Sequence, residues 1–285
     1  MKKNILLVFA MLVPLLVNCK VDNSPNCQIR WCTFNIRLLH EGDEKAGVGW
    51  SVRKDRVANY IKEKHIDIVG MQEVLHPQLQ DLLERLPEYD YVGVGRTDGK
   101  TKGEYSPVFF LKEKYEVLEK GNFWLSETPD VPGSKGWDAA LERIASYAKL
   151  RDKATGKVFM AVNTHFDHVG TVAREEAGKL IMERMEALVP EGDVVFLTGD
   201  FNANWDNPIL GPIREKLGNC RETAPETDGR NTFNAWGEKD VPDGTDIIDH
   251  IFYRGVTAVR YEVLTGDYGV PFVSDHWPVL GTFRY

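Results

Sequence analysis

The hydrophobic positions of this chain fall mostly into short apolar runs, a pattern typical of buried β-strands. In chain order the runs are residues 29–34, 67–71, 106–111, 117–125, 144–150, 158–164, 194–198, 247–253, 259–264 and 279–283. Two of these runs flank Thr155-Gly156, and this spacing predicts a β-hairpin. The chain is therefore expected to be rich in strands.

Two segments show helical spacing instead. We expect one helix over residues 51–64, with Ser51 as its N-cap, and a second around residues 177–188. Residues 127–137 are rich in Pro and Gly and are expected to form a loop. The apolar positions that indicate the first helix are Val52, Val57, Tyr60 and Ile61, and those that indicate the second are Ala177, Leu180, Ile181, Met185 and Leu188. Many strands with few helices predict an α+β layered sandwich.

Composition and charge narrow the class of protein. Of the 285 residues, 42% are hydrophobic and 27% charged, which is ordinary for a soluble globular protein. No repeat or Pro/Ser-rich linker follows residue 27, so residues 28–285 are expected to form one domain. The formal net charge is -8 and no dense Lys/Arg block occurs, which argues against a protein that grips long nucleic acid.

The N-terminus has the features of an export signal. Lys2 and Lys3 precede an apolar run from Ile5 to Val17 that is short for a membrane span. The run ends at Leu-Val-Asn-Cys, which resembles a lipoprotein box with Cys19 as the acylated residue; an ordinary cleaved signal peptide is the alternative. Residues 1–19 are therefore expected to direct export, to the periplasm or the cell surface, and to lie outside the fold.

The other cysteines are Cys27, Cys32 and Cys220, so at most one disulfide can form among them. Export permits a disulfide, and buried free thiols are the alternative. The spacing matches no zinc-binding pattern.

Polar residues gather where the apolar runs end, and loops at strand ends are where sites are commonly built. Each of these residues alone could be a turn or surface residue, but six polar motifs occur in order along one chain. They are Asn-Ile-Arg at 35–37, Gln-Glu-Val at 72–74, Asn-Thr-His at 163–165, Gly-Asp-Phe-Asn at 199–202, Asp249 within an apolar strand, and Ser-Asp-His at 274–276.

This order of motifs resembles the endonuclease/exonuclease/phosphatase superfamily, from about Gln28 to Tyr285. The superfamily includes nucleases, sphingomyelinases and inositol polyphosphate phosphatases. The resemblance implies a four-layer αββα sandwich, with the site at one end of the two packed sheets. It also implies Mg²⁺-dependent phosphoester hydrolysis, with Mn²⁺ as a possible substitute, because oxygen ligands select these hard cations.

The resemblance also implies roles for individual residues. Glu73 is expected to be the principal metal ligand, Asn35 to help position the metal or the phosphate, and Asp275 to assist the metal. Asp200 is expected to orient and deprotonate the attacking water, and Asn202 to hold a phosphate oxygen.

Three further residues complete the expected site. Asp249 is expected to pair with His276, to fix its tautomer and to stabilise its imidazolium form. His165 is expected to donate to a phosphoryl oxygen as negative charge develops.

Weaker candidates surround this set. Among Arg37, Arg96, Arg143 and Arg174, we favour Arg143 for binding substrate, although a surface charge or a structural ion pair is the ordinary role of each. Trp137, Phe233 and Trp236 could stack on substrate or could simply pack in the core. His168 neighbours His165, while strand alternation directs His250 away from the face of Asp249.

Three functions remain open from the sequence. The first is a phosphatase or phosphodiesterase acting on small phosphorylated molecules. The second is a secreted nuclease acting on DNA or RNA, and the third is a surface binding module with an inactive site. The complete set of motifs argues against the third. No protein partner is implied, and contact with a membrane is expected only through a lipid anchor at Cys19.

Overall fold

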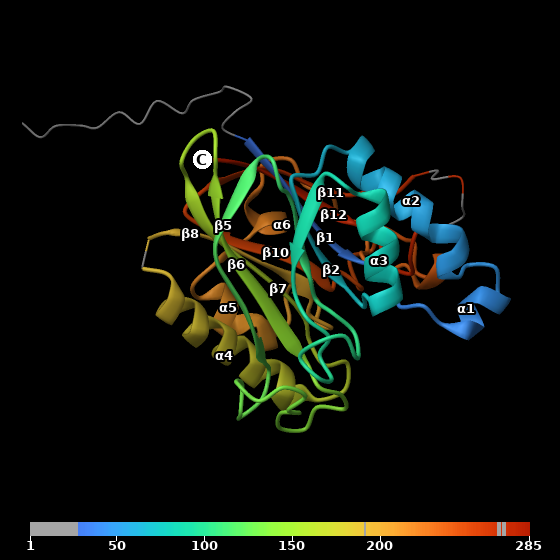
Figure 1. Ribbon diagram of the computed structural model, residues 1–285, viewed down its shortest axis with the longest axis horizontal. Helices are drawn as coiled ribbons and strands as arrows, with labels where there is room; N and C mark the ends of the chain where they lie inside the picture. The colour runs from blue at the N-terminus through green and yellow to red at the C-terminus, as the bar shows by residue number, and fades with distance from the viewer. Residues whose placement is uncertain (1–27, 191, 267–268, 270–271) are drawn as a thin grey trace, which may run out of the picture.

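Two six-stranded β-sheets pack face to face in the computed structural model, which describes residues 28–190, 192–266, 269 and 272–285 (Figure 1). The first sheet has the order β11-β12-β1-β2-β4-β3 and the second β5-β6-β7-β8-β10-β9. The strands of the first sheet are β1 (Gln28–Asn35), β2 (Ile68–Gln72), β3 (Tyr89–Val92), β4 (Val108–Leu111), β11 (Thr257–Val263) and β12 (Val279–Arg284). Those of the second are β5 (Tyr115–Trp124), β6 (Ile144–Asp152), β7 (Val158–His165), β8 (Val194–Asp200), β9 (Gly218–Asn219) and β10 (Asp249–Arg254).

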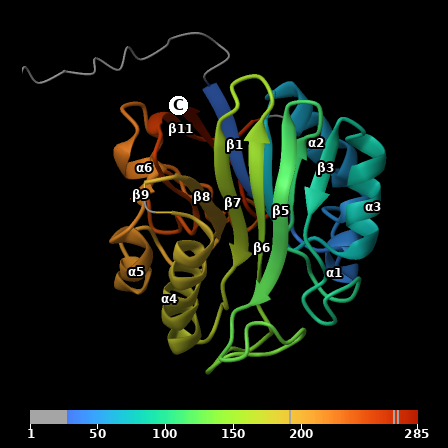
Figure 2. The ribbon, with the colours of Figure 1, turned by 60° about the vertical axis from the view of Figure 1, so that its left-hand side comes forward.

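Helices cover the outer faces of both sheets. The helices are α1 (Glu41–Lys45), α2 (Trp50–Glu63), α3 (His76–Arg85), α4 (Thr171–Leu188), α5 (Gly211–Arg214) and α6 (Cys220–Thr223). In Figure 2, α2 and α3 lie on one side of the molecule and α4 and α5 on the other. This arrangement confirms the predicted four-layer αββα sandwich. Within the described ranges, no helix combines the length and apolar character needed to cross a bilayer.

Aromatic side chains fill the space between the sheets. Trp31 of β1 stacks on Phe196 of β8, with ring centroids 4.1 Å apart. Phe159 and Phe283 meet Phe196 edge-on from β7 and β12. Because these side chains come from both sheets, their burial fixes one sheet against the other.

A polar network crosses the same interface just below the strand ends. The buried Asn163 side chain donates to the carbonyl oxygen of Met71 at 2.6 Å and accepts from Gln72 Nε2 at 2.7 Å. A methyl group at Gly70 would lie 2.4 Å from both Asn163 Oδ1 and Thr198 Oγ1. Glycine is therefore required at position 70, and the two sheets are held in register directly beneath the site.

Most of the expected elements are confirmed, with differences at helix starts. The hairpin at Thr155-Gly156 joins β6 and β7 as predicted. The helix predicted from Ser51 begins one residue earlier, at Trp50, with Gly49 as N-cap, because the Ser51 hydroxyl donates instead to Glu44. Helix α3 was not predicted.

Two cysteines are buried free thiols, Cys32 and Cys220, so no disulfide joins that pair. The predicted signal segment, Cys19 and Cys27 lie outside the described residues.

Candidate active site

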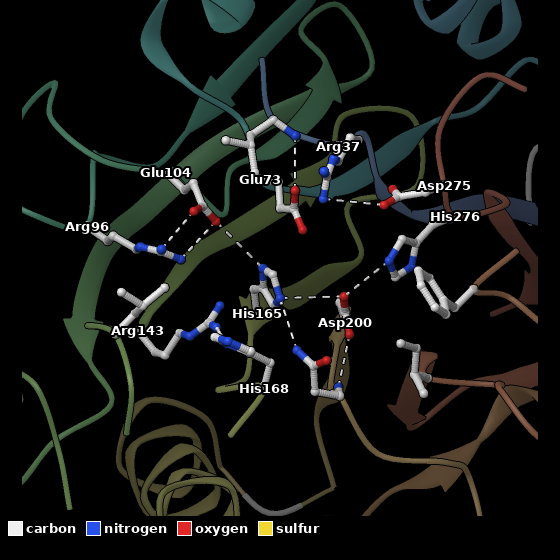
Figure 3. Close-up of a pocket in the computed structure, with 15 residues that line it drawn as sticks. Arg37, Glu73, Arg96, Glu104, Arg143, His165, His168, Asp200, Asp275 and His276 are labelled. Carbon is white, nitrogen blue, oxygen red and sulfur yellow. Dashed lines mark hydrogen bonds and ion pairs between the residues drawn. The ribbon is translucent and has the colours of Figure 1, made fainter. Parts of the chain in front are cut away.

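Strands β1, β2, β7 and β8 all end at one pocket of about 460 Å³, drawn in Figure 3. Strands β1 and β2 are parallel, as are β7 and β8, so each pair delivers its terminal residues to the same edge. The lining residues are Arg37, Leu38, Glu73, Arg96, Glu104, Leu141, Arg143, His165, His168, Asp200, Asn202, Phe233, Ile248, Asp275 and His276.

Strand register explains how residues far apart in sequence come together. Asp200 at the end of β8 pairs with His165 on one side and with Asp249 on the other. In the first sheet, Asn35 pairs with Gln72, the residue before Glu73. Hydrogen bonds between residues of the two sheets then bring these strand ends together at one pocket.

Asn35 links the two carboxylates that approach from opposite sheets. Its Nδ2 donates to Glu73 Oε1 and to Asp200 Oδ2, both at 3.0 Å. Its Oδ1 accepts from the backbone N–H of Arg37 at 3.0 Å. With all its polar atoms engaged, Asn35 orients Glu73 and Asp200.

Three of the seven non-glycine residues with positive φ in the described part of the chain line the pocket. Arg37, Glu73 and Asn202 all have positive φ, at 57°, 62° and 46°. Non-glycine residues rarely adopt this region, and such conformations gather at functional sites where surrounding contacts enforce them. For Glu73, one such contact is the backbone N–H of Leu38, which donates to Oε2 at 3.0 Å.

Asp249 and His276 form the expected hydrogen-bonded pair. Their Oδ2 and Nδ1 atoms are 2.9 Å apart, and Asp249 is fully buried. Burial alone would lower the pKa of His276, but the adjacent Asp249 carboxylate outweighs it and raises that pKa to about 10. His276 Nε2 points toward Asp200 Oδ2 at 3.7 Å. A charged imidazolium therefore faces the pocket at neutral pH.

His165 has the opposite electrostatic setting. Burial, followed by the positive charges of Arg143 and Arg96, lowers its pKa well below the usual value. Asn202 Nδ2 lies 3.1 Å from His165 Nε2 and donates to the carbonyl oxygen of Phe166. The pocket thus pairs one neutral histidine with one charged histidine, as expected of groups that divide acid and base roles.

Asp200 lies between the two histidines. Its Oδ2 is 3.5 Å from His165 Nε2, and its Oδ1 accepts from the Asn202 backbone N–H at 2.9 Å. Burial and the negative charge of Asp249 raise the pKa of Asp200 above that of an ordinary aspartate. A carboxylate with a raised pKa is suited to accept a proton near neutral pH.

Arg53, which the sequence did not suggest, holds two pocket loops in place. Its buried guanidinium donates to the carbonyl oxygens of Ile36 at 2.7 Å and Val273 at 2.9 Å. These carbonyls come immediately before Arg37 and before the Ser-Asp-His motif. Arg37 in turn lies 3.5 Å from Asp275. The role of Arg53 is therefore to position the residues around Asp275.

Two groups of side chains have the chemistry to hold a divalent cation. Ligand atoms of Asp200, Asp249 and His276 lie within 4.8 Å of one another, but Asp249 and His276 are already hydrogen-bonded to each other. Glu73 and Asp275 also offer carboxylate oxygens to the pocket. Burial raises the pKa of Asp275, the positive charge of His276 lowers it, and the negative charge of Glu73 raises it again. Two such carboxylates fit a hard cation such as Mg²⁺ or Mn²⁺.

Comparison with known proteins decides the family. Residues 32–276 match the sequence profile described as the Endonuclease/Exonuclease/phosphatase family. The chain belongs to the endonuclease/exonuclease/phosphatase family. Members of this family are metal-dependent phosphoesterases and nucleases, so the chain is a metal-dependent hydrolase of phosphate esters.

Solved structures of the endonuclease/exonuclease/phosphatase family superpose closely on this fold. A family protein from Bacteroides vulgatus is 44% identical, covers 90% of this chain and 98% of its own, and has a TM-score of 0.85. A mannosyl-6-phosphatase from Bacteroides thetaiotaomicron is 37% identical, with the match covering 90% of this chain and 100% of that one, and has a TM-score of 0.84. The Ccr4 exoribonuclease subunit of Coccidioides immitis is 31% identical over 135 residues, which is 41% of this chain and 18% of that protein.

The pocket of this endonuclease/exonuclease/phosphatase family member includes most of the residues proposed from sequence. Asn35 and Asp249 lie directly behind it, and Phe233 lines it with its ring centroid 4.9 Å from that of His276. Trp137 and Arg174 are not among the lining residues of this pocket, and a contact between Trp137 and substrate stays a prediction. Trp236 packs over Arg53 instead. His250 faces away, bonded to the Ala203 carbonyl, as strand alternation predicted.

Sequence reasoning missed Glu104. This residue lies in the loop between β3 and β4, where Arg96 binds it through two hydrogen bonds of 2.8 and 2.7 Å. No strand-end pattern marks it. The only sequence signal is a Gly-Glu pair at 103–104, which is too common to single out.

Proposed function

We propose that this chain is an exported phosphatase that uses Mg²⁺ or Mn²⁺ to hydrolyse small phosphomonoesters. The observation that carries the proposal is the pocket itself, in which buried histidines and carboxylates from both sheets face one cavity. Such a pocket matches the size of sites for small molecules. The net charge of -8 disfavours long nucleic acid, and the 37% identical relative named a mannosyl-6-phosphatase favours a monoester.

The proposed reaction assigns each group a task. Glu73 and Asp275 hold the cation, which neutralises phosphate charge when bound. Asn35 keeps Glu73 and Asp200 aligned, and Asp200 accepts a proton from the attacking water.

The remaining groups act on the phosphate. When phosphate binds, Asn202 would exchange its hydrogen bond to His165 Nε2 for one to a phosphoryl oxygen, and neutral His165 would donate to a phosphoryl oxygen as well. Charged His276, held by Asp249, stabilises the negative charge that develops as the ester bond breaks. His276 gives its proton to the leaving oxygen, Asp200 has taken one from the attacking water, and the products are inorganic phosphate and the alcohol.

A substrate panel tests this proposal. The full chain should release phosphate from hexose 6-phosphate and glycerol phosphate in the presence of Mg²⁺ or Mn²⁺. It should act on bis(p-nitrophenyl) phosphate with a kcat/KM lower by about 100-fold or more, because a monoester offers the donors and the cation one more charged oxygen than a diester does. The measurement is phosphate or nitrophenol release at several substrate concentrations.

A nuclease is the second candidate, favoured by the partial match to the Ccr4 exoribonuclease subunit. The same panel should include single-stranded RNA and DNA. Shortening of either nucleic acid, without phosphate release from the monoesters, would replace the phosphatase proposal with the nuclease.

Export rests on residues 1–19, and we propose that Cys19 is acylated after signal removal. Cys19→Ser should then move the protein from the membrane fraction to the soluble periplasmic fraction, as measured by fractionation and immunoblotting. A wild-type protein found wholly in the soluble fraction would favour an ordinary cleaved signal instead. Ser51→Ala, which keeps Cys19, is the matched control and should fractionate as the wild type does.

A further inference from the structure

One wall of the pocket has no part in the reaction described above. Arg96, Glu104, Arg143 and His168 form this wall, with Leu141 beside them, and we call it the arginine wall (Figure 3). Arg96 and Arg143 are buried, with 7% and 4% of their surface exposed. Burying two guanidinium groups is costly unless each is paired. Their partners within the protein therefore determine which hydrogen-bond donors of the wall remain free for a ligand.

Arg143 is only partly satisfied by the protein. Its Nε donates to Asp167 Oδ2 at 3.3 Å, and its Nη2 lies 3.0 Å from His168 Nδ1. Its Nη1 has no hydrogen-bond partner among the described residues. A buried donor without an acceptor costs free energy, and Arg143 lines the pocket, so an acceptor on a bound ligand would remove this cost.

His168 provides a second open donor. Arginine can only donate, so the contact with Arg143 makes Nδ1 of His168 the acceptor in the neutral ring. The proton of that ring is then on Nε2. His168 is exposed, and therefore this N–H is available to a ligand in the pocket.

The arginine wall carries little net charge. Arg96 is paired with Glu104, and Arg143 with Asp167, so two positive charges meet two negative ones. A second phosphate here would meet the Glu104 carboxylate without excess positive charge to neutralise it. Neutral hydroxyl groups suit the wall better, because each can accept from Arg143 or His168 and donate to Glu104.

We propose that the arginine wall binds the hydroxyl groups of a singly phosphorylated polyol, that is, a sugar monophosphate whose ring lies between Arg143 and Phe233. This inference rests on the proposed phosphatase function and names its substrate class. Phe233 lines the pocket beside His276 and is partly exposed, so an apolar edge of the sugar can pack against it. Arg143, His168 and Glu104 then determine specificity, while the phosphate is held at the base.

The test compares three phosphomonoesters on wild type and variants: hexose 6-phosphate, hexose 1,6-bisphosphate and propyl phosphate, which lacks the ring hydroxyls. Arg143→Lys keeps the charge beside Asp167 but removes Nη1 and Nη2, and His168→Ala changes an exposed side chain outside the core. Each variant should lower kcat/KM for hexose 6-phosphate by about 10- to 100-fold more than for propyl phosphate, the effect of losing a hydrogen bond to a charged or polar donor. Arg214→Lys, at a surface pair with Glu222 outside the pocket, is the matched control.

Each outcome decides between the proposals. An equal loss on hexose and propyl phosphates would overturn the hydroxyl-binding role while leaving the phosphatase intact. A preference for the bisphosphate that Arg143→Lys removes would show a second anion site instead. No hydrolysis of any monoester by the wild type would overturn the phosphatase itself, and with it this inference. Thermal unfolding of Arg143→Lys checks its fold, and His168→Ala carries the test if that variant is unstable.

Discussion

Replacing Asp249 by Asn should lower kcat by about 100- to 10,000-fold at neutral pH, the range that general acid–base groups supply. The carboxylate is fully buried and 2.9 Å from His276 Nδ1, so its charge is what keeps the imidazole positively charged. Asparagine has nearly the same shape but no charge. His276→Asn should cost a similar factor, and the double variant should be little worse than the worse single one, because the two residues act as a unit. The measurement is kcat for each variant on the best monoester of the panel.

The matched control lies on the same strand. His250 is the next residue after Asp249 but faces the opposite side, where it bonds to the Ala203 carbonyl. His250→Gln retains a donor for that carbonyl and should leave kcat within about threefold, as expected of a residue that does not contact the reacting groups. Additive losses in the Asp249 and His276 double variant would show that the two residues do not work together.

Removal of divalent cations should abolish activity, and Mg²⁺ or Mn²⁺ should restore it. Glu73→Gln should raise the cation concentration needed for half-maximal activity by at least about tenfold, the lower limit typical even of residues that only support a ligand. Glutamine keeps the shape of the side chain but has a single oxygen, so it can accept from only one of Asn35 and Leu38, and it removes the negative charge. Calorimetric titration of Mg²⁺ into the full chain measures the affinity independently of turnover.

The same titration distinguishes the two candidate cation sites. If the cation binds at Glu73 and Asp275, Asp249→Asn should leave the affinity almost unchanged while Glu73→Gln weakens it. The reverse pattern would place the cation at the group of Asp200, Asp249 and His276. Glu142→Gln, close to the pocket but outside its lining, is the control for a general loss of negative charge.

The layered fold and the positions of the candidate site residues were predictable because both follow local patterns, whereas the roles of those residues came from the family resemblance. Short apolar runs specify strands whichever sheet they join, and polar residues at their ends are visible as breaks in those runs. Asp249 stood out because a carboxylate within an apolar run needs a buried partner, and His276 is that partner.

Features that depend on tertiary contacts were not predictable in this way. Helix α3 has no Ser, Thr, Asp or Asn at its N-cap; Leu75 occupies that position, and the Gln78 side chain accepts its backbone N–H. Ser51 has the residue type of a cap, but its hydroxyl donates a hydrogen bond to Glu44 of a separate helix. Glu104 reaches the pocket only because Arg96 holds it there across the same loop.

The direction of β1 bears on what the enzyme can reach if Cys19 is acylated as proposed. The strand starts at Gln28 and ends at Asn35, immediately behind the pocket, so these two residues mark opposite ends of a segment about 23 Å long. A chain tethered through a lipid at Cys19 has a tether of only nine residues to Gln28, with a reach of about 30 Å at full extension. Turning the pocket toward the bilayer would use nearly all of that reach. If Cys19 carries the proposed lipid, the pocket would therefore meet solutes in the surrounding fluid more readily than the headgroups of its own bilayer.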